Sequence, residues 1–318
     1  MKRILVTFDI FREAFAELEE RYEVTFPENG TFSYEEVLAM IPEYDALCSA
    51  FTFPVDRALI ERGERLQLIA NYGVGYNNID VACAEERGVA VANTPDPVVA
   101  PTANLALGLM IDAARRITES DRRWRRQRGE MKRGQLENLG CSITGQRLGI
   151  LGMGRIGSAL AKRAVACGME VIYHNRRRLH ISEETRLNVT YATKEELLAT
   201  SDFVSLNAPY TPATHHLIGR EELALMKPSA ILINTARGAM VDEKALVEAL
   251  RSGVIRGAAL DVFEVNDFPD AALFEMENVV LTPHIGTQTG DARIAMVKAM
   301  SNNVIGFFEG DRRVSRVV

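Results

Sequence analysis

Residues 148–157 read LGILGMGRIG, an apolar strand pattern that runs into three glycines and then into a helix pattern at Ser158–Ala166. Gly152 would permit a tight turn, Gly154 would let the backbone approach a pyrophosphate, and Gly157 would let helix and strand pack closely. The start of such a helix offers unpaired N–H groups and the positive end of its dipole to phosphates. Because a second strand pattern follows, the run predicts a dinucleotide-binding turn.

Strand and helix patterns alternate along two stretches of the chain. In the first stretch the strand patterns are Arg3–Phe8, Glu23–Phe26, Ala46–Ser49, Leu66–Ala70 and Val89–Ala92, and the helix patterns are Phe11–Arg21, Tyr34–Ile41, Val55–Gly63 and Asp80–Gly88. In the second stretch the strand patterns are Arg147–Leu151, Glu170–His174, Phe203–Asn207, Ala230–Thr235, Gly257–Val262 and Val279–Thr282. This alternation predicts parallel sheets covered by helices on both faces. Because 318 residues exceed one ordinary core, we expect an α/β protein of two doubly wound domains.

The stretch between the two series differs from both. Prolines mark a break, a helix pattern follows at Thr102–Arg116, and nine basic residues then crowd together: Arg115, Arg116, Arg122, Arg123, Arg125, Arg126, Arg128, Lys132 and Arg133. The cluster is either a nucleic-acid patch or a solvated arm or subunit interface. We favour the second interpretation, because acidic residues are interspersed and Trp124 is the one aromatic residue available for stacking. A further amphipathic helix, expected at Asp291–Gly310, could return to the first domain.

Composition excludes several classes of protein. A net charge of -6 gives no electrostatic footprint for nucleic acid or an anionic membrane. No stretch approaches the roughly 20 apolar residues of a membrane helix, and the apolar run at Ile4–Phe8 is too short for a signal peptide. The four cysteines are scattered without ligand spacing, which suits a reducing cytoplasm and predicts neither disulfides nor a metal site.

The end of the second strand of the dinucleotide unit indicates which dinucleotide is bound. An NAD site usually places an acidic residue there, about 20 residues after the glycines, to hold the ribose hydroxyls. Here the strand ends in Tyr173-His174-Asn175-Arg176-Arg177-Arg178, with three arginines and no acid. An arginine fork binds a 2′-phosphate through charge-assisted hydrogen bonds. We therefore predict NADP(H) as the preferred cofactor, with NAD(H) possible if these arginines form only a solvated turn.

Four further motifs resemble one protein family. They are YGVGYNNID at 72–80, ILINTARGAMVDE at 231–243, GAALDVF at 257–263 and VLTPHIG at 280–286. Together they resemble the D-isomer-specific 2-hydroxyacid dehydrogenases, and the YHNRRRL run at 173–179 looks most like the NADP-dependent glyoxylate/hydroxypyruvate reductases of that family. The resemblance implies a flavodoxin-like substrate domain of residues 1–100 plus 287–318 and a Rossmann dinucleotide-binding domain of residues 101–286. It also implies a homodimer formed through residues 101–139.

The resemblance assigns roles to the candidate site residues. Arg237, which follows a strand, matches the arginine that orients the substrate's carboxylate and carbonyl. Backbone N–H groups of Val74 and Gly75 match the loop that grips the carboxylate. His284 matches the histidine that exchanges a proton with the substrate oxygen, and His174, His180, His215 and His216 are expected to be structural. The residues matching cofactor positions are Thr102, Gly152, Met153, Gly154, Arg155, Ile156, Gly157, Asn175, Arg176, Arg177, Pro209, Thr235, Ala236, Asp261 and Gly286. Asp261 would bond the nicotinamide carboxamide, or else would only cap local structure.

One position departs from the family pattern. Most members carry a glutamate that pairs with the histidine, and here that position is Asn266. An amide can orient an imidazole but brings no charge to favour its protonation. Three interpretations follow: Asn266 orients His284 alone, Glu264 or Asp267 replaces the missing carboxylate, or the site is catalytically weak.

The resemblance implies reduction of a small 2-oxo acid, with glyoxylate and hydroxypyruvate as the first candidates. Two alternatives stay open at this point. Formate dehydrogenases of the family also carry an amide at the position of Asn266, because their reaction needs no proton donor. The family also includes transcriptional corepressors that sense a dinucleotide without turnover.

Overall fold

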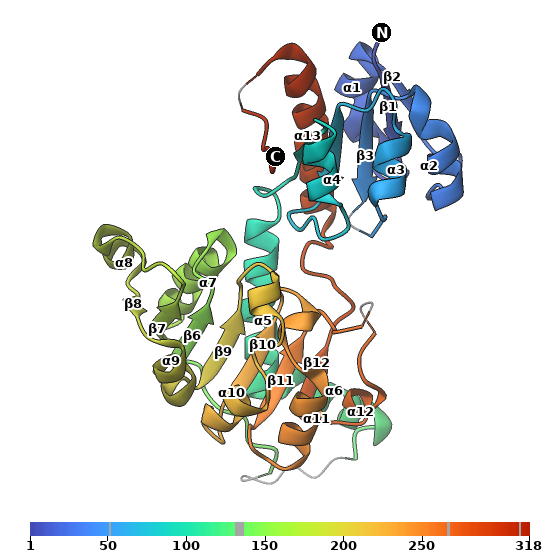
Figure 1. Cartoon of the computed structure of the whole chain (residues 1–318). Helices are drawn as coiled ribbons and strands as arrows, with labels where there is room; N and C mark the ends of the chain where they lie inside the picture. Colours follow the sequence, from blue (N-terminus) through green and yellow to red (C-terminus); the bar gives the residue numbers. More distant parts are fainter. Residues whose placement is uncertain (51, 131–136, 266–267, 312) are drawn as a thin grey trace. The chain divides into compact units, whose positions relative to one another are not determined.

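The computed structural model describes residues 1–318 except 51, 131–136, 266–267 and 312. The chain folds into two compact units (Figure 1). The first unit consists of Met1–Val98 and Thr287–Val318, and the second of Val99–Gly286. The second unit is therefore inserted into the sequence of the first, which is assembled from two separate pieces of chain.

The described part of the first unit contains a five-stranded parallel sheet with the order β2-β1-β3-β4-β5. Its strands are β1 (Arg3–Val6), β2 (Glu23–Thr25), β3 (Ala46–Ala50), β4 (Leu68–Tyr72) and β5 (Ala90–Ala92). Its helices are α1 (Ala16–Arg21), α2 (Tyr34–Met40), α3 (Arg57–Arg62), α4 (Val81–Glu86) and α13 (Gly290–Glu309). This is the flavodoxin-like strand order, in which the direction of winding reverses between β1 and β3.

The last residues of the chain pair with the edge of this sheet. The Val317 N–H donates to the Val91 carbonyl at 2.7 Å, and the Val91 N–H donates to the Val318 carbonyl at 3.2 Å. Ala92 and Arg316 form an antiparallel bridge. The tail therefore covers the free edge of β5, whose backbone groups would otherwise remain unpaired.

The described part of the second unit contains a seven-stranded parallel sheet with the order β12-β11-β10-β9-β6-β7-β8. Its strands are β6 (Arg147–Leu151), β7 (Glu170–His174), β8 (Thr190–Tyr191), β9 (Phe203–Leu206), β10 (Ile231–Asn234), β11 (Gly257–Leu260) and β12 (Val279–Leu281). Its helices are α5 (Val99–Arg115), α6 (Ile117–Arg126), α7 (Arg155–Ala166), α8 (Ile181–Leu187), α9 (Lys194–Thr200), α10 (Arg220–Leu225), α11 (Glu243–Arg251) and α12 (Ala271–Phe274). The strand order reverses between β6 and β9, and ligands bind such sheets at the carboxyl ends of the strands beside this reversal.

Two hydrophobic cores cover the two faces of this second sheet. Strand β10 reads ILIN, and alternate side chains of a strand point to opposite faces. Ile231 and Ile233 join the core that contains residues of α5 and α7, whereas Leu232 joins the core that contains residues of α9, α10 and α11. Burial on both faces explains why the strands of this unit read as continuous apolar runs.

The main differences from the predicted elements lie at short or charged segments. The helix after the glycine turn begins at Arg155, not at Ser158 as predicted, because Gly154 already takes the N-cap position. The two-residue strand β8 was not predicted. Part of the basic segment forms α6, in which arginines pair with the interspersed acids: Arg123 with Glu119, and Arg125 with Asp121.

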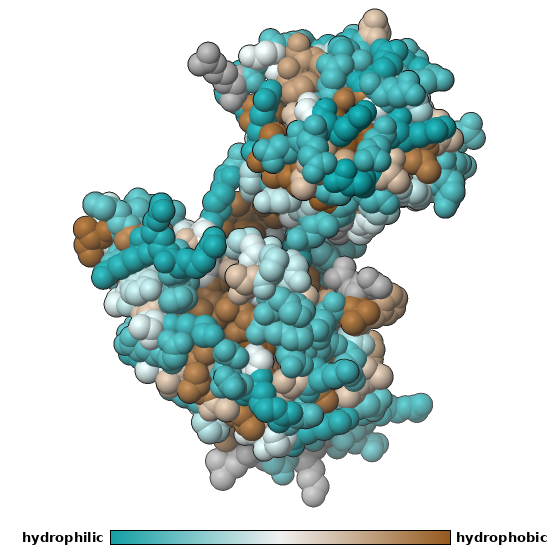
Figure 2. Space-filling view, in the orientation of Figure 1, coloured by the Kyte–Doolittle hydropathy of each residue, from teal (hydrophilic) through white to brown (hydrophobic). Residues whose placement is uncertain are grey.

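On the face shown in Figure 2, hydrophilic side chains cover most of each unit and hydrophobic ones form separate patches. No described helix combines the length and the apolar character needed to cross a membrane. Among the described residues, no three His, Cys, Asp or Glu side chains gather in a way that could hold a metal ion.

Candidate functional site

The glycine turn after β6 has the geometry that a dinucleotide requires. Gly152 has φ +103°, and a Cβ there would lie 2.3 Å from the Ala208 nitrogen. A Cβ on Gly157 would lie 2.3 Å from the Gly152 carbonyl oxygen, so only glycine lets α7 approach the turn. A Cβ on Gly154 would instead point into open space. Gly152 and Gly157 are thus required by packing, and Gly154 leaves room for a ligand beside the backbone.

The amino-terminal end of α7 borders this open space. Gly154 is its N-cap, and because glycine has no side chain it makes no side-chain cap hydrogen bond to the first turn of the helix. The Met153 N–H, in contrast, donates to the Asn175 Oδ1 at 2.7 Å, which ties the turn to the end of β7. A 12-residue helix with an uncapped amino end suits a pyrophosphate group.

The three arginines after β7 have different surroundings. Arg178 donates two hydrogen bonds of 2.8 Å to the Glu184 carboxylate, whose side chain is 4% exposed. These bonds lower the pKa of Glu184 to about 2, and the Tyr173 hydroxyl donates to the same carboxylate at 2.8 Å. Arg176 and Arg177 are exposed. Arg178, although its side chain is 57% exposed, is therefore already paired with Glu184, and the other two arginines are the candidates for a 2′-phosphate.

The neighbouring strands end in further cofactor candidates. Pro209 follows β9, and Thr235 and Ala236 follow β10. Thr235 is 8% exposed, and its Oγ1 has no hydrogen-bond partner among the residues that the structure describes. A buried hydroxyl without a partner keeps its hydrogen-bonding capacity available for a ligand or a water molecule. The residues at this edge thus fit a bound dinucleotide.

Asp261 organises the turn that carries His284. Its carboxylate accepts hydrogen bonds from the Thr282 hydroxyl at 2.6 Å, the Ile285 N–H at 2.8 Å and the Gly286 N–H at 2.9 Å. Its carbonyl accepts from the His284 N–H at 2.9 Å. Burial raises the pKa of Asp261, although these donors act in the opposite direction.

His284 itself has φ +51°, in the left-handed region that non-glycine residues rarely adopt. Such conformations persist where surrounding structure enforces them, and they cluster at functional sites. A Cβ on Gly286 would lie 3.5 Å from the Thr102 Oγ1, so α5 borders this turn as well. Asp261 therefore holds the His284 turn through three hydrogen bonds to its carboxylate, of which Oδ2 accepts one from within the described chain.

Arg237 is a half-buried residue in the turn after β10. The Asn234 side-chain amide donates to the Arg237 carbonyl at 2.9 Å, and the Asn234 Oδ1 accepts from the Ala236 N–H at 3.0 Å. A buried asparagine at the strand end thus fixes the backbone on which the guanidinium is carried.

In the first unit, the loop after β4 contains Val74 and Gly75. The Asn93 side-chain amide donates to the Val74 carbonyl at 2.9 Å, and the Asn71 amide donates to the Gly75 carbonyl at 2.7 Å. For the N–H groups of Val74 and Gly75, no acceptor is present within the described part of the chain. Two buried amides therefore hold the carbonyls and leave two N–H groups for an anion. A polar residue at the end of an apolar strand is the one sequence signal that could have indicated these asparagines.

Asn266 and Asp267 lie outside the described residues. Glu264 is described, and it binds elsewhere: its Oε1 lies 2.5 Å from the His216 Nε2, and its Oε2 accepts from the Glu243 N–H at 3.2 Å. These two contacts of Glu264 were not predicted from the sequence.

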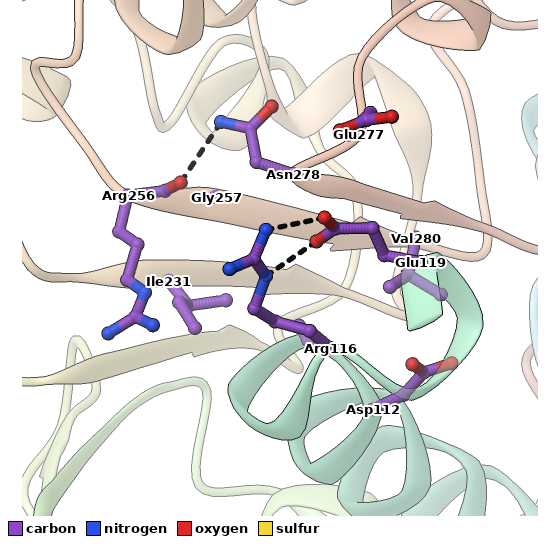
Figure 3. Close-up of a pocket in the computed structure, with 10 residues that line it drawn as sticks. Asp112, Arg116, Glu119, Ile231, Arg256, Gly257, Glu277, Asn278 and Val280 are labelled. Atoms are coloured by element: carbon purple, nitrogen blue, oxygen red, sulfur yellow. Dashed lines mark hydrogen bonds and ion pairs between the residues drawn. The ribbon is translucent and has the colours of Figure 1, made fainter. Parts of the chain in front are cut away.

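A pocket of about 320 Å³ opens at the opposite edge of the second sheet, where β10, β11 and β12 begin (Figure 3). Arg116 and Glu119 face each other in it, with the Arg116 Nε donating to Glu119 at 2.6 Å. Asn278 donates to the Arg256 carbonyl at 3.0 Å. Because none of the predicted cofactor or catalytic residues lines this pocket, it is separate from the candidate site.

A Rossmann sheet with a glycine turn after its first strand, together with a flavodoxin-like unit in the same chain, is typical of nicotinamide-dependent oxidoreductases. Residues 107–286 match the NAD-binding domain of the D-isomer specific 2-hydroxyacid dehydrogenases, and the chain belongs to that family. This confirms the family and the fold class that the sequence motifs predicted.

Relatives of known name support the same class. The chain is 43% identical to a glyoxylate reductase of Thermococcus litoralis, over 97% of this chain and 94% of that protein. It is 41% identical to a glyoxylate reductase of Korarchaeum cryptofilum, over 97% and 93%. Among solved structures, it resembles an NADPH-dependent glyoxylate/hydroxypyruvate reductase of Sinorhizobium meliloti in complex with NADP and malonate, with a TM-score of 0.86, 30% identity and coverage of 100% and 97%. The protein is thus a D-2-hydroxyacid dehydrogenase.

Proposed function

We propose that this enzyme reduces a small 2-oxo acid, glyoxylate or hydroxypyruvate first of all, and that it prefers NADPH to NADH. The substrate class is supported by relatives named glyoxylate reductase that align over nearly the whole chain. The cofactor preference rests on one observation: β7 is followed by an amide, Asn175, and by two exposed arginines, Arg176 and Arg177, where an NAD site would carry a carboxylate.

When bound, the nicotinamide would supply a hydride to the carbonyl carbon of the substrate. The backbone N–H groups of Val74 and Gly75 would bind the substrate carboxylate. The Arg237 guanidinium would hold the carboxylate and polarise the carbonyl, because it is planar and permanently charged. The His284 imidazolium would give its proton to the oxygen that becomes the hydroxyl. Asp261 would keep His284 in place and accept a bond from the nicotinamide carboxamide.

Asn266 would orient the imidazole by a hydrogen bond and, being an amide, would add no charge beside it. Of the two acids that could replace the missing carboxylate, Glu264 and Asp267, we favour Glu264 less. Both of its carboxylate oxygens already have hydrogen-bond partners.

Initial rates of NADPH and NADH oxidation with glyoxylate and with hydroxypyruvate, from about pH 5 to about pH 8, test the proposal. We expect turnover of both acids and a strong preference for NADPH over NADH across this pH range. Tight NADPH binding without turnover of either acid would overturn the substrate proposal, and equal rates with both cofactors would overturn the cofactor proposal.

We also propose a cytoplasmic homodimer that associates through residues 101–139. Acid-paired arginines of α6 and the pocket beside α5 lie in or next to this segment. A monomer in sedimentation at micromolar concentration would overturn the dimer.

A further inference from the structure

A group of hydrogen bonds connects three loops at the carboxyl edge of the second sheet. The loops follow β9, β10 and β11, which are neighbours in the sheet. The Glu264 carboxylate, after β11, binds the His216 Nε2 of the β9 loop at 2.5 Å and the Glu243 N–H after β10 at 3.2 Å. The Glu264 N–H donates to the Glu243 carboxylate at 3.0 Å. We name His216, Glu243 and Glu264 the three-loop brace.

The brace directly adjoins Arg237. A Cβ on Gly238 would lie 1.8 Å from the carbonyl carbon of Phe263, and 2.5 Å from the Glu264 nitrogen. The backbone after Arg237 therefore packs against the backbone of Phe263–Glu264 with no intervening side chain. Since Asn234 holds the Arg237 carbonyl on the other side, displacement of Glu264 would be transmitted to Arg237.

His216 contacts the same turn by a second route. Its backbone N–H donates to the Ala239 carbonyl at 2.9 Å. Its ring stacks on that of His215 with centroids 3.9 Å apart. Two residues before His216, the Thr214 hydroxyl donates to the Pro209 carbonyl at 3.0 Å. The brace thus links the Arg237 turn to the loop that contains a cofactor candidate.

The chemistry of the brace suits positioning. Glu243 is 8% exposed, and the side chains of His216 and Glu264 are 35% and 25% exposed. Carboxylates held by backbone N–H groups and an imidazole are fixed in direction, because each bond constrains a different oxygen. Because its carboxylate is held in this way, Glu264 restricts the position of the backbone at Gly238, which follows Arg237.

We propose that the three-loop brace is a positioning unit that sets the orientation of Arg237 toward the 2-oxo acid. This inference rests on the proposed role of Arg237 in binding that substrate. A shift of about 1 Å in an orienting group can lower a rate by about 100-fold, so small movements of the brace are sufficient for a measurable effect.

Glu264→Ala removes both side-chain bonds, and Glu264→Gln keeps an oxygen and an amide in the same place. With glyoxylate and NADPH, we expect Glu264→Ala to lower kcat/KM by about 10- to 100-fold, while the Kd for NADPH by fluorescence changes less than about twofold. Glu264→Gln should recover most of the loss. Glu222→Ala is the matched control, because Glu222 also bridges a side chain, Lys194 at 2.8 Å, and a backbone N–H, Gly219 at 3.1 Å.

A double-mutant cycle with Arg237→Lys makes the inference specific. If Glu264 acts through Arg237, the combined loss in kcat/KM is smaller than the product of the two single losses. Independent, multiplicative losses would overturn the brace, as would an equal loss in Glu222→Ala. If Arg237→Lys alone leaves kcat/KM unchanged, the proposed substrate role of Arg237 fails instead.

Discussion

The three consecutive arginines after β7 offer a sharp test of cofactor choice, because the structure separates them. Arg176 and Arg177 are exposed, whereas Arg178 makes two bonds to Glu184. We therefore predict that the double variant Arg176→Ala, Arg177→Ala loses preference for NADPH, and that Arg178→Ala loses thermal stability instead.

The size of the expected change in cofactor preference can be estimated from the solvent exposure of Arg176 and Arg177. An exposed ionic contact contributes about 1 kcal/mol, since water and salt screen it. Two such contacts to a 2′-phosphate contribute about 2 kcal/mol, which corresponds to a roughly 30-fold change at 1.4 kcal/mol for each factor of ten. NADH has no 2′-phosphate, so its kcat/KM should stay unchanged while that of NADPH falls.

The assay is the ratio of kcat/KM for NADPH to that for NADH, measured with glyoxylate at low and at high salt, beside a thermal unfolding curve for each variant. Added salt should reduce the ratio in the parent enzyme and have little effect in the double variant. The reasoning is refuted if the double variant keeps the parental ratio, or if Arg178→Ala changes the ratio equally with its Tm intact.

Three further predictions address other parts of the candidate site. His284→Gln should lower kcat by about 100- to 10,000-fold with NADPH affinity retained in fluorescence titration; full turnover would contradict the role of proton donor. Asn93→Ala should raise KM for glyoxylate and leave the Kd for NADPH unchanged, because the Val74 carbonyl loses its partner; a parallel loss of NADPH binding would contradict this. Glu184, whose pKa is lowered to about 2 by Arg178, should stabilise the fold fully above its unfolded pKa of about 4.3 and progressively less as pH falls toward 2. Acid unfolding curves of Glu184→Gln should lack this component, and an unchanged acid profile would contradict it.

The periodicity of apolar residues predicted the bounds of a strand correctly where the strand is buried on both faces of the sheet. Strands β6 and β7 have the predicted bounds, because both faces of the sheet are buried and the apolar runs are continuous. The same criterion did not predict β8, because a strand of two residues is too short to show an alternating pattern. It also missed α6, whose arginines are neutralised by acids on the same helix, Glu119 and Asp121.

For the site, the sequence could indicate which residues follow strands and therefore share an edge. It could not indicate which polar groups pair across loops. Arg178 pairs with Glu184, which lies six residues further along the chain. Glu264 pairs with His216, which lies 48 residues earlier in the chain. Such partners depend on how the strands are ordered in the sheet, and hydrophobic periodicity carries no information about them.

The split sequence of the first unit has a consequence for biosynthesis. During translation, β1 to β5 emerge first, then the whole second unit, and only then α13 and the tail. Asn93, which holds the Val74 carbonyl, itself depends on that late segment: the Asn303 amide donates to its carbonyl at 2.8 Å and the Ser315 hydroxyl to its Oδ1 at 3.0 Å. The second unit is contiguous in the sequence, so it can fold while α13 and the tail are still being synthesised. The loop that carries Val74 and Gly75 would therefore mature only after α13 and the tail have been synthesised.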